Sequence, residues 1–318
     1  MGEPTSFLMQ TAQAGHPTDY LLARIRRRRR DLLTDRTAPA QRQAESEQGA
    51  SARGMTAREA RRNMRQEFRW VYLQMDQGMR NTFASLFLWF ELRTILISLR
   101  LQRTSGQGES PPAQEESLLA QRVLRVFSGV EAPFTGSDPL SELLQADAKQ
   151  IRILGNWYRE QKGREYEERF LALYLEMVSR QKLHPVLREF FSALVDLNNL
   201  LALRKQIRWQ LYPPHPFIEG GTAGRKRLEK AQQEGEPGLL KLLRSQPGLS
   251  ELSALPDNLE HLLLVRLTRK VEKLGADPLG IGIILAYLWE CTIEARNASV
   301  VQHAALLGDE TLTAELIG

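Results

Sequence analysis

The sequence predicts an all-α protein, and three observations support that prediction. Leu, Ala, Arg, Glu and Gln, which favour helices, dominate the composition. The alternation of Val, Ile and Thr that is typical of strands is nearly absent. Blocks with helical spacing are divided by segments rich in Pro and Gly. With 318 residues, 42% hydrophobic and 25% charged, the chain is globular in composition and long enough to bury two or three cores.

The first part of the chain predicts an arginine-rich helix over residues 17–34 and a polar loop over residues 35–54. Helical spacing then returns in "MTAREARRNMRQEFRWVYLQM". Two further Pro- and Gly-rich segments follow, "RTSGQGESPPAQEES" and "YPPHPFIEGGTAG". They predict three helical subdomains, at residues 1–105, 106–212 and 213–318.

A weak internal repeat supports the division into three. An acid followed three residues later by Thr or Asn recurs at intervals of about a hundred residues, at Glu91 and Thr94, Asp196 and Asn199, and Glu294 and Asn297. Positions i and i+3 lie on one helix face, so each pair makes a polar notch on an apolar helix. Such a notch must be hydrogen-bonded if it is buried. It either ties one subdomain together or faces a cavity that a partner fills, and chance similarity among amphipathic helices is the alternative.

The stretch "DPLGIGIILAYLWECTIEARN", at residues 277–297, predicts a core helix. One apolar stripe follows helical spacing, formed by Ile281, Ile284, Leu285 and Leu288. Asp277 and Pro278 are typical of a helix start, and we expect Gly280 and Gly282 to let another helix approach closely.

The second half of this helix is polar. Glu290 and Glu294 are like charges four residues apart, which favours a basic group opposite them. That group could be an internal arginine or a basic partner.

Several functional classes lack support in the sequence. The single cysteine, Cys291, excludes an intrachain disulfide, and we interpret it as core filling. The histidines show no metal-ligand spacing, and "GGTAGRKRL" lacks the order of a phosphate-binding loop. The longest uncharged apolar run is too short to span a membrane. We therefore predict no catalytic site, no metal, no cofactor and no transmembrane segment.

The chain is basic, with a net charge of +5 and a pI near 9.4. The excess is concentrated early, at Arg24, Arg26, Arg27, Arg28, Arg29 and Arg30. At 100° per residue, five consecutive arginines point all round a helix and cannot form one nucleic-acid stripe. We expect some to pair with internal acids and others to face anionic headgroups or acidic loops, with plain surface solvation as the alternative. A helical nucleic-acid-binding adaptor that uses "RIRRRRR" and "GRKRLEK" is the competing function.

Four motifs, in order along the chain, resemble the C subunit of archaeal and bacterial V/A-type ATPases, whose eukaryotic counterpart is the d subunit of the vacuolar proton pump. Residues 277–316 are similar to the C-terminal signature of that family. The other matching positions are Tyr20, Ala23, Arg24 and Ile25, then Asp196, Asn199 and Leu200, and then Gly220 and Gly221. Ala298 and Ser299 depart from the bulkier Leu and Arg that are usual in the family.

The resemblance implies a funnel-shaped protein of three related helical subdomains around a central cavity. It implies a non-catalytic rotor component at the cytoplasmic face of the membrane, with central-stalk subunits and rotor-ring proteolipids as partners and no nucleic acid. We use "socket" for the residues that we expect to line or brace the cavity for the stalk, namely Glu91, Arg93, Asp196, Asn199, Glu290, Glu294, Arg296 and Asn297. The early arginines are expected near the ring and the membrane.

Overall fold

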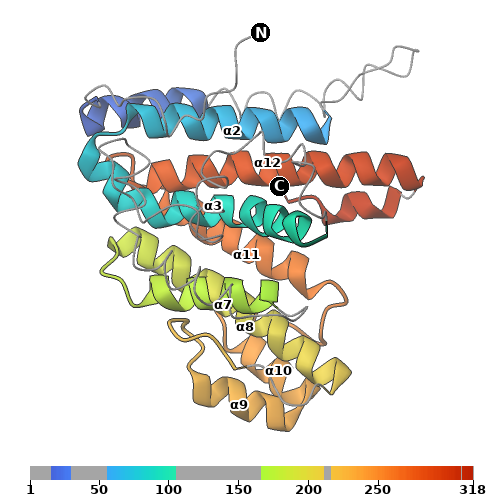
Figure 1. The fold of residues 1–318 in the computed structure, drawn as a ribbon. Coiled ribbons are helices and arrows are strands. Elements are labelled where there is room, and N and C mark those ends of the chain that lie inside the picture. The colour runs from blue at the N-terminus through green and yellow to red at the C-terminus, as the bar shows by residue number, and fades with distance from the viewer. Residues whose placement is uncertain (1–15, 30–55, 105–165, 211–215, 309, 318) are drawn as a thin grey trace. The chain divides into compact units, whose positions relative to one another are not determined.

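The computed structural model describes residues 16–29, 56–104, 166–210, 216–308 and 310–317 (Figure 1). Within these ranges the secondary structure is helical and no strand is present, which confirms the predicted all-α class. The helices are one over residues 18–29, α2 (Ala57–Gln74), α3 (Gln77–Thr104), α7 (Tyr166–Ser179), α8 (Pro185–Trp209), α9 (Arg225–Glu234), α10 (Glu236–Arg244), α11 (Leu259–Leu274), α12 (Gly282–Leu307) and the 3₁₀ helix η3 (Glu310–Glu315).

The predicted arginine-rich helix is present over residues 18–29. The loop predicted at 35–54 lies outside the described residues, as does Arg30. The predicted subdomain boundaries fall within the undescribed ranges 105–165 and 211–215, so the three-subdomain funnel stays a prediction.

The described chain forms two compact units. Unit 1 contains the described residues between Met75 and Leu255, and unit 2 contains those between His16 and Gln74 and those from Pro256 onward. Unit 2 therefore joins segments from the two ends of the sequence, and local sequence patterns alone do not specify that pairing.

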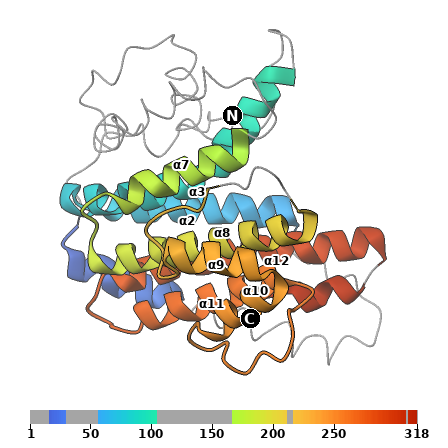
Figure 2. The same cartoon turned by 90° about the horizontal axis from the view of Figure 1, so that it is seen from below.

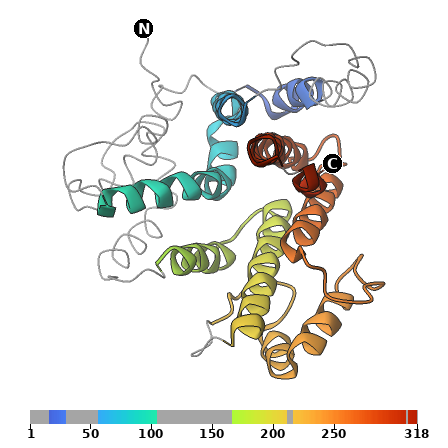
Figure 3. The same cartoon turned by 90° about the vertical axis from the view of Figure 1, so that its right-hand side faces the viewer.

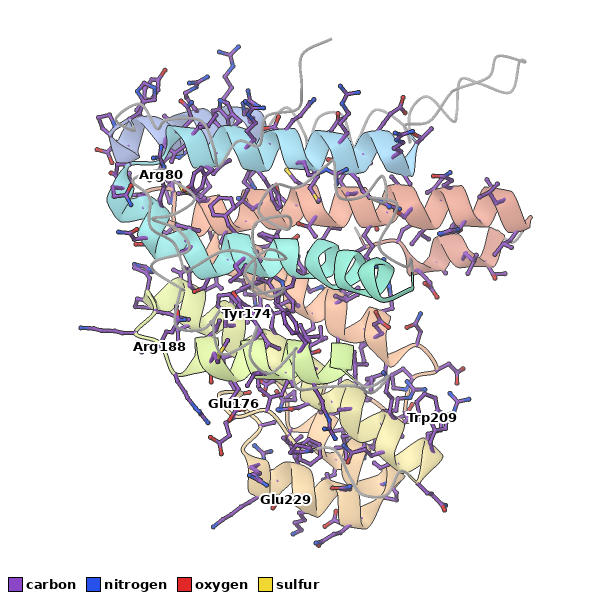
Figure 4. The ribbon with its side chains drawn as sticks, viewed as in Figure 1. Arg80, Tyr174, Glu176, Arg188, Trp209 and Glu229 are labelled. Atoms are coloured by element: carbon purple, nitrogen blue, oxygen red, sulfur yellow. The ribbon has the colours of Figure 1, made fainter. Side chains whose placement is uncertain are left out.

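Unit 1 is built around α8. Helix α7 packs against α8, and α9 and α10 pack against each other and against α8 (Figure 2). The side chain of Tyr174 on α7 is fully buried, and its hydroxyl donates to the backbone oxygen of Ser85 on α3 at 2.6 Å (Figure 4). Buried phenol groups need such a partner, so this bond fixes the pairing of α3 with α7.

Unit 2 is built around α12, which packs against α2, α11 and η3 (Figure 3). The sequence predicted that a single apolar stripe of this helix is buried, but the buried surface is wider. Every residue from Gly282 to Cys291 is buried, because neighbouring helices cover this part of α12 on all sides. Cys291 is 3% exposed, which confirms that it fills the core.

The predicted start of this helix at Asp277 and Pro278 was wrong. Helix α12 begins at Gly282, and the carboxylate of Asp277 accepts from the backbone N–H of Leu279 at 3.0 Å within the preceding turn. A Cβ atom on Gly282 would lie 1.9 Å from the backbone oxygen of Leu274, at the end of α11. The close approach predicted for Gly282 is confirmed, whereas the atoms nearest to a Cβ on Gly280 belong to the side chain of Asp277 in the same turn.

Candidate functional site

Two predicted socket residues of unit 1 clamp a loop onto α8. The side chain of Asn199 donates from Nδ2 to the backbone oxygen of Ile218 at 2.8 Å and accepts the backbone N–H of Ile218 at 2.8 Å. Asp196 accepts the hydroxyl of Thr222 and, at 2.9 Å, the backbone N–H of Ala223. Asp196 and Asn199 are 3% and 1% exposed, so these bonds satisfy polar groups that burial would otherwise leave costly. We call this arrangement the unit 1 clamp.

The two glycines of the loop make the unit 1 clamp possible. Gly220 has φ 104°, and a Cβ atom there would lie 2.4 Å from Cβ of Ser179. A Cβ atom on Gly221 would lie 2.3 Å from Oδ1 of Asp196 and 3.1 Å from a methyl carbon of Val195. The loop therefore reaches the carboxylate of Asp196 only because its backbone carries no side chain at these positions.

Unit 2 has a matching arrangement at the end of the sequence. Asn297 on α12 donates from Nδ2 to the backbone oxygen of Ile317 at 2.7 Å and accepts the backbone N–H of Ile317 at 3.1 Å. Arg296 donates to the backbone oxygen of Glu315 at 2.9 Å, and the carboxylate of Glu315 accepts from Asn258 at 2.9 Å. We call this the unit 2 clamp.

The two clamps share a sequence signal that the repeat analysis missed. Each asparagine binds both backbone groups of an isoleucine about twenty residues downstream, and that isoleucine follows an apolar residue. The segments read "FIEG" in unit 1 and "LIG" in unit 2. A search for the asparagine together with its downstream apolar–Ile pair could have found the clamps.

The arginine-rich helix is held in unit 2 through partly buried charges. Arg28 donates to Glu67 on α2 at 2.6 Å, and Glu67 also accepts the hydroxyl of Tyr287 on α12 at 2.6 Å. Burial lowers the pKa of Arg28, but the hydrogen bond and the charge of Glu67 outweigh it and hold that pKa above its ordinary value. Burial raises the pKa of the Tyr287 phenol, with further contributions from Cys291 and from the bond to Glu67.

A second ion pair links the same helix to α12. Arg29 and Glu290 are 2.7 Å apart, and the side chain of Glu290 is only 9% exposed. The basic group expected opposite Glu290 is therefore an internal arginine. Arg26 donates to the backbone oxygen of Pro278, and Arg27 is exposed. As expected, the consecutive arginines point to different sides of the helix.

Aromatic rings also contact the arginines of this helix. The guanidinium of Arg28 lies 4.0 Å from the ring centroid of Trp70, and that of Arg24 lies 5.0 Å from the same centroid. Arg24 also donates to the side chain of Gln74 at 3.0 Å and lies 5.5 Å from the ring of Tyr20. Cation–π contacts of this kind favour the packed position of the helix.

Within each unit, the structure places the described socket residues in separate groups of contacts. Asp196 and Asn199 form the unit 1 clamp, whereas Arg296 and Asn297 belong to the unit 2 clamp and Glu290 to the ion pair with Arg29. Glu294 is half-buried on α12. The side chains of Glu91 and Arg93 lie outside the described residues, so the third copy of the repeat is untested.

The described residues contain no cluster of three or more His, Cys, Asp or Glu side chains that could hold a metal ion. Among the same residues, no helix combines the length and hydropathy of a membrane span. The clamps combine neutral amide–backbone hydrogen bonds from the asparagines with charge-assisted bonds from Asp196 and Arg296. The ion pairs of Arg28 and Arg29 are charge-assisted as well.

Comparison with known proteins identifies the same family as the sequence motifs. The chain is 32% identical over 130 residues to the C subunit of V-type ATP synthase from two strains of Thermus thermophilus. Each match covers 39% of this chain and 39% of the relative's length. The family model of the ATP synthase (C/AC39) subunit matches residues 40–308, which include both asparagines of the clamps. The chain therefore belongs to the ATP synthase (C/AC39) subunit family.

Proposed function

We propose that this protein is a non-catalytic rotor component that links the central stalk of a rotary V/A-type ATPase to its membrane rotor ring. In this role it couples ATP hydrolysis or synthesis to ion transport and sits at the cytoplasmic face of the membrane. The observation that carries the proposal is the family match over residues 40–308. The all-helical body agrees with it.

A coupling part must transmit torque without yielding, and the packing supports such stiffness. Protein interiors are dense and poorly compressible, so a buried helix such as α12 resists deformation. Asn199 and Asn297 each bind both the backbone N–H and the backbone carbonyl oxygen of an isoleucine in a following non-helical segment. These bonds tie that segment to the helix that carries the asparagine. We therefore assign Asp196, Asn199, Arg296 and Asn297 the role of bracing the socket.

The arginine-rich helix divides into two groups under this proposal. Arg24, Arg28 and Arg29 are committed to contacts within unit 2. Arg26 and Arg27 are exposed, and we assign them to meet anionic headgroups or acidic loops of the ring.

Affinity purification of the tagged protein from native membranes, with identification of the co-purified proteins, tests the proposal. We expect recovery of rotor-ring proteolipids together with central-stalk subunits. Recovery of neither group from intact membranes contradicts the proposal. The variants Asp196→Lys and Glu294→Lys should recover less stalk protein, while Lys226→Glu, an exposed change in unit 1, should not.

A further inference from the structure

The C-terminal end of α8 presents a tryptophan to solvent beside two cations. Trp209, the last residue of the helix, is 57% exposed, and Figure 4 shows it at the end of α8. Arg208 and Lys205 are exposed as well. At 100° per residue these three residues fall within an arc of about 100°, and the buried residues of the same turns, Leu203 and Gln206, fall outside that arc. We call Lys205, Arg208 and Trp209 the α8 tip.

The exposure of Trp209 sets it apart from the other tryptophans that the structure describes. Trp289 is 5% exposed, and its indole N–H donates to a threonine hydroxyl in the core at 3.0 Å. The ring of Trp89 stacks on a buried tyrosine, and the ring of Trp70 lies under a guanidinium group. An indole is large and mostly apolar, so a partner that covers Trp209 would remove a substantial apolar surface from water.

The part of the chain around the α8 tip is basic. Residues 197–250 contain nine Lys and Arg against four Asp and Glu. Glu229 pairs with Arg225 at 2.8 Å, Glu234 pairs with Lys230 at 3.7 Å, and Glu236 lies in the first turn of α10, where the helix dipole favours an acid. The fourth acid lies near the arginine that begins α9. Among the described residues, no acid pairs with the arginine of the tip, so the charge of the tip favours an anionic partner.

We propose that the α8 tip binds the headgroup region of a bilayer that contains anionic lipids. Its two cations meet the anionic headgroups, and the indole enters the boundary between headgroups and acyl chains, where tryptophan is enriched. The helix dipole by itself favours a cation in the last turn of α8, but it does not account for the exposed indole beside that cation. The inference rests on the proposed function for the membrane at which the chain sits, and it names a surface that touches the lipid.

Two other anionic partners would use the tip less completely. An acidic protein satisfies the two cations, but the indole then needs an apolar pocket on that protein as well. Single-stranded nucleic acid stacks successive bases on several aromatic rings. Among the described residues of α8, α9 and α10, Trp209 is the exposed aromatic side chain, so it offers a platform for one base. A bilayer surface satisfies the cations and the indole together.

The test uses the purified full chain and co-sedimentation with phosphatidylcholine vesicles that contain or lack phosphatidylserine. The tip variants are Arg208→Gln and Trp209→Ala. The control variant, Lys182→Gln/Arg188→Gln, removes two exposed cations near the opposite end of α8. All these side chains are exposed, so circular dichroism should show unchanged helix content in each variant.

We expect the unaltered chain to bind vesicles with phosphatidylserine more tightly than vesicles without it, and added salt to weaken this preference. Arg208→Gln should weaken binding about fivefold, as the loss of one cation near an anionic surface predicts. Trp209→Ala should weaken it about tenfold through lost apolar burial. The control variant should bind within about twofold of the unaltered chain, because its cations lie away from the tip.

Tryptophan fluorescence gives a second readout, which also serves if Trp209→Ala misfolds. On binding to the vesicles, the emission of the unaltered chain should shift to shorter wavelength, and lipids with brominated acyl chains should quench it. Both signals should be lost in Trp209→Phe, which keeps an aromatic ring at this position.

Three results would overturn the inference. The unaltered chain could bind both kinds of vesicle equally or neither of them. The tip variants could bind as the unaltered chain does, or the control variant could lose as much affinity as they do. Finally, the tip variants could lose binding to duplex DNA or to an acidic helical peptide while they keep binding to vesicles, which would assign the tip to that partner. These measurements need no other subunit, so their failure is separate from failure of the co-purification test of the rotor function.

Discussion

The unit 1 clamp and the unit 2 clamp use the same asparagine chemistry in different surroundings. Asn199 is 1% exposed and lies beside a second buried acceptor, Asp196, which binds the loop further along. Asn297 is half-buried, and the residue beside it, Arg296, is a donor that binds the backbone oxygen of Glu315. Both clamps therefore use an asparagine, whereas the charged residue near it is an acceptor, Asp196, in unit 1 and a donor, Arg296, in unit 2.

The apolar residues of the two clamps differ as well. In unit 1 the buried side chain is Phe217, one residue before the clamped Ile218, whereas in unit 2 the clamped Ile317 is itself buried. The comparison indicates that the asparagine positions the backbone and that packing then selects which apolar side chain enters the core.

The largest expected effect is the loss of the carboxylate in the unit 1 clamp. Asp196→Ala leaves the hydroxyl of Thr222 and the backbone N–H of Ala223 without their acceptor, and should lower the free energy of unfolding by about 3 kcal/mol. Urea unfolding followed by circular dichroism measures this change. The matched change in unit 2, Glu294→Ala, should have a smaller effect because Glu294 is more exposed. Equal losses would show that the two acids are equivalent.

The next largest effect is expected at Gly221, where the absence of a side chain lets the loop approach α8. In Gly221→Ala, the new methyl group would meet Asp196 at 2.3 Å and force the loop away from α8, at a cost of about 2 kcal/mol. Hydrogen exchange at the amide of Ala223 should become faster. Gly224→Ala in the same loop has open space around its Cβ position and serves as the control. Unchanged protection in Gly221→Ala would refute this account of the loop.

Removing each asparagine side chain compares the clamps directly. Asn199→Ala should lower the free energy of unfolding by about 2 kcal/mol and Asn297→Ala by about 1 kcal/mol, because the side chain of Asn199 is fully buried whereas that of Asn297 is half-buried and partly open to water. Thermal unfolding of the two variants measures the difference. A larger loss of unfolding free energy for Asn297→Ala than for Asn199→Ala would show that burial of the asparagine does not set the strength of the clamp.

The smallest effect at neutral pH concerns Tyr287, whose bond to Glu67 contributes about 1 kcal/mol. Burial raises the pKa of Tyr287 above the ordinary value of 10.0, so the folded chain keeps this proton where the unfolded chain releases it. The associated stability is fully present below about pH 10 and is lost as the pH rises above it.

Unfolding measured from about pH 8 to about pH 11 should therefore show a decline that Tyr287→Phe reduces. The exposed-tyrosine variant Tyr20→Phe is the control and should retain the decline. An identical decline in Tyr287→Phe would remove Tyr287 as its cause.

The sequence was most informative where local chemistry decides the outcome. Helix-favouring composition and Pro–Gly breaks predicted the all-α class, and the acid–x–x–Asn repeat identified Asn199 and Asn297 as hydrogen-bonded positions. Spacing also predicted that consecutive arginines cannot share one face, and Arg26, Arg28 and Arg29 do contact different groups.

Tertiary structure decided which segments those residues meet. Helix α2 packs on α12 although more than two hundred residues separate them, and this pairing puts Glu67 next to Tyr287. The helix over residues 18–29 also meets α12, where Arg29 pairs with Glu290. Packing also buries α12 on every side from Gly282 to Cys291, and the helix begins at Gly282, where the end of α11 comes close. Periodicity shows which face of a helix is apolar, but the partner is chosen by packing and by the need to satisfy buried polar groups, both of which depend on distant parts of the chain.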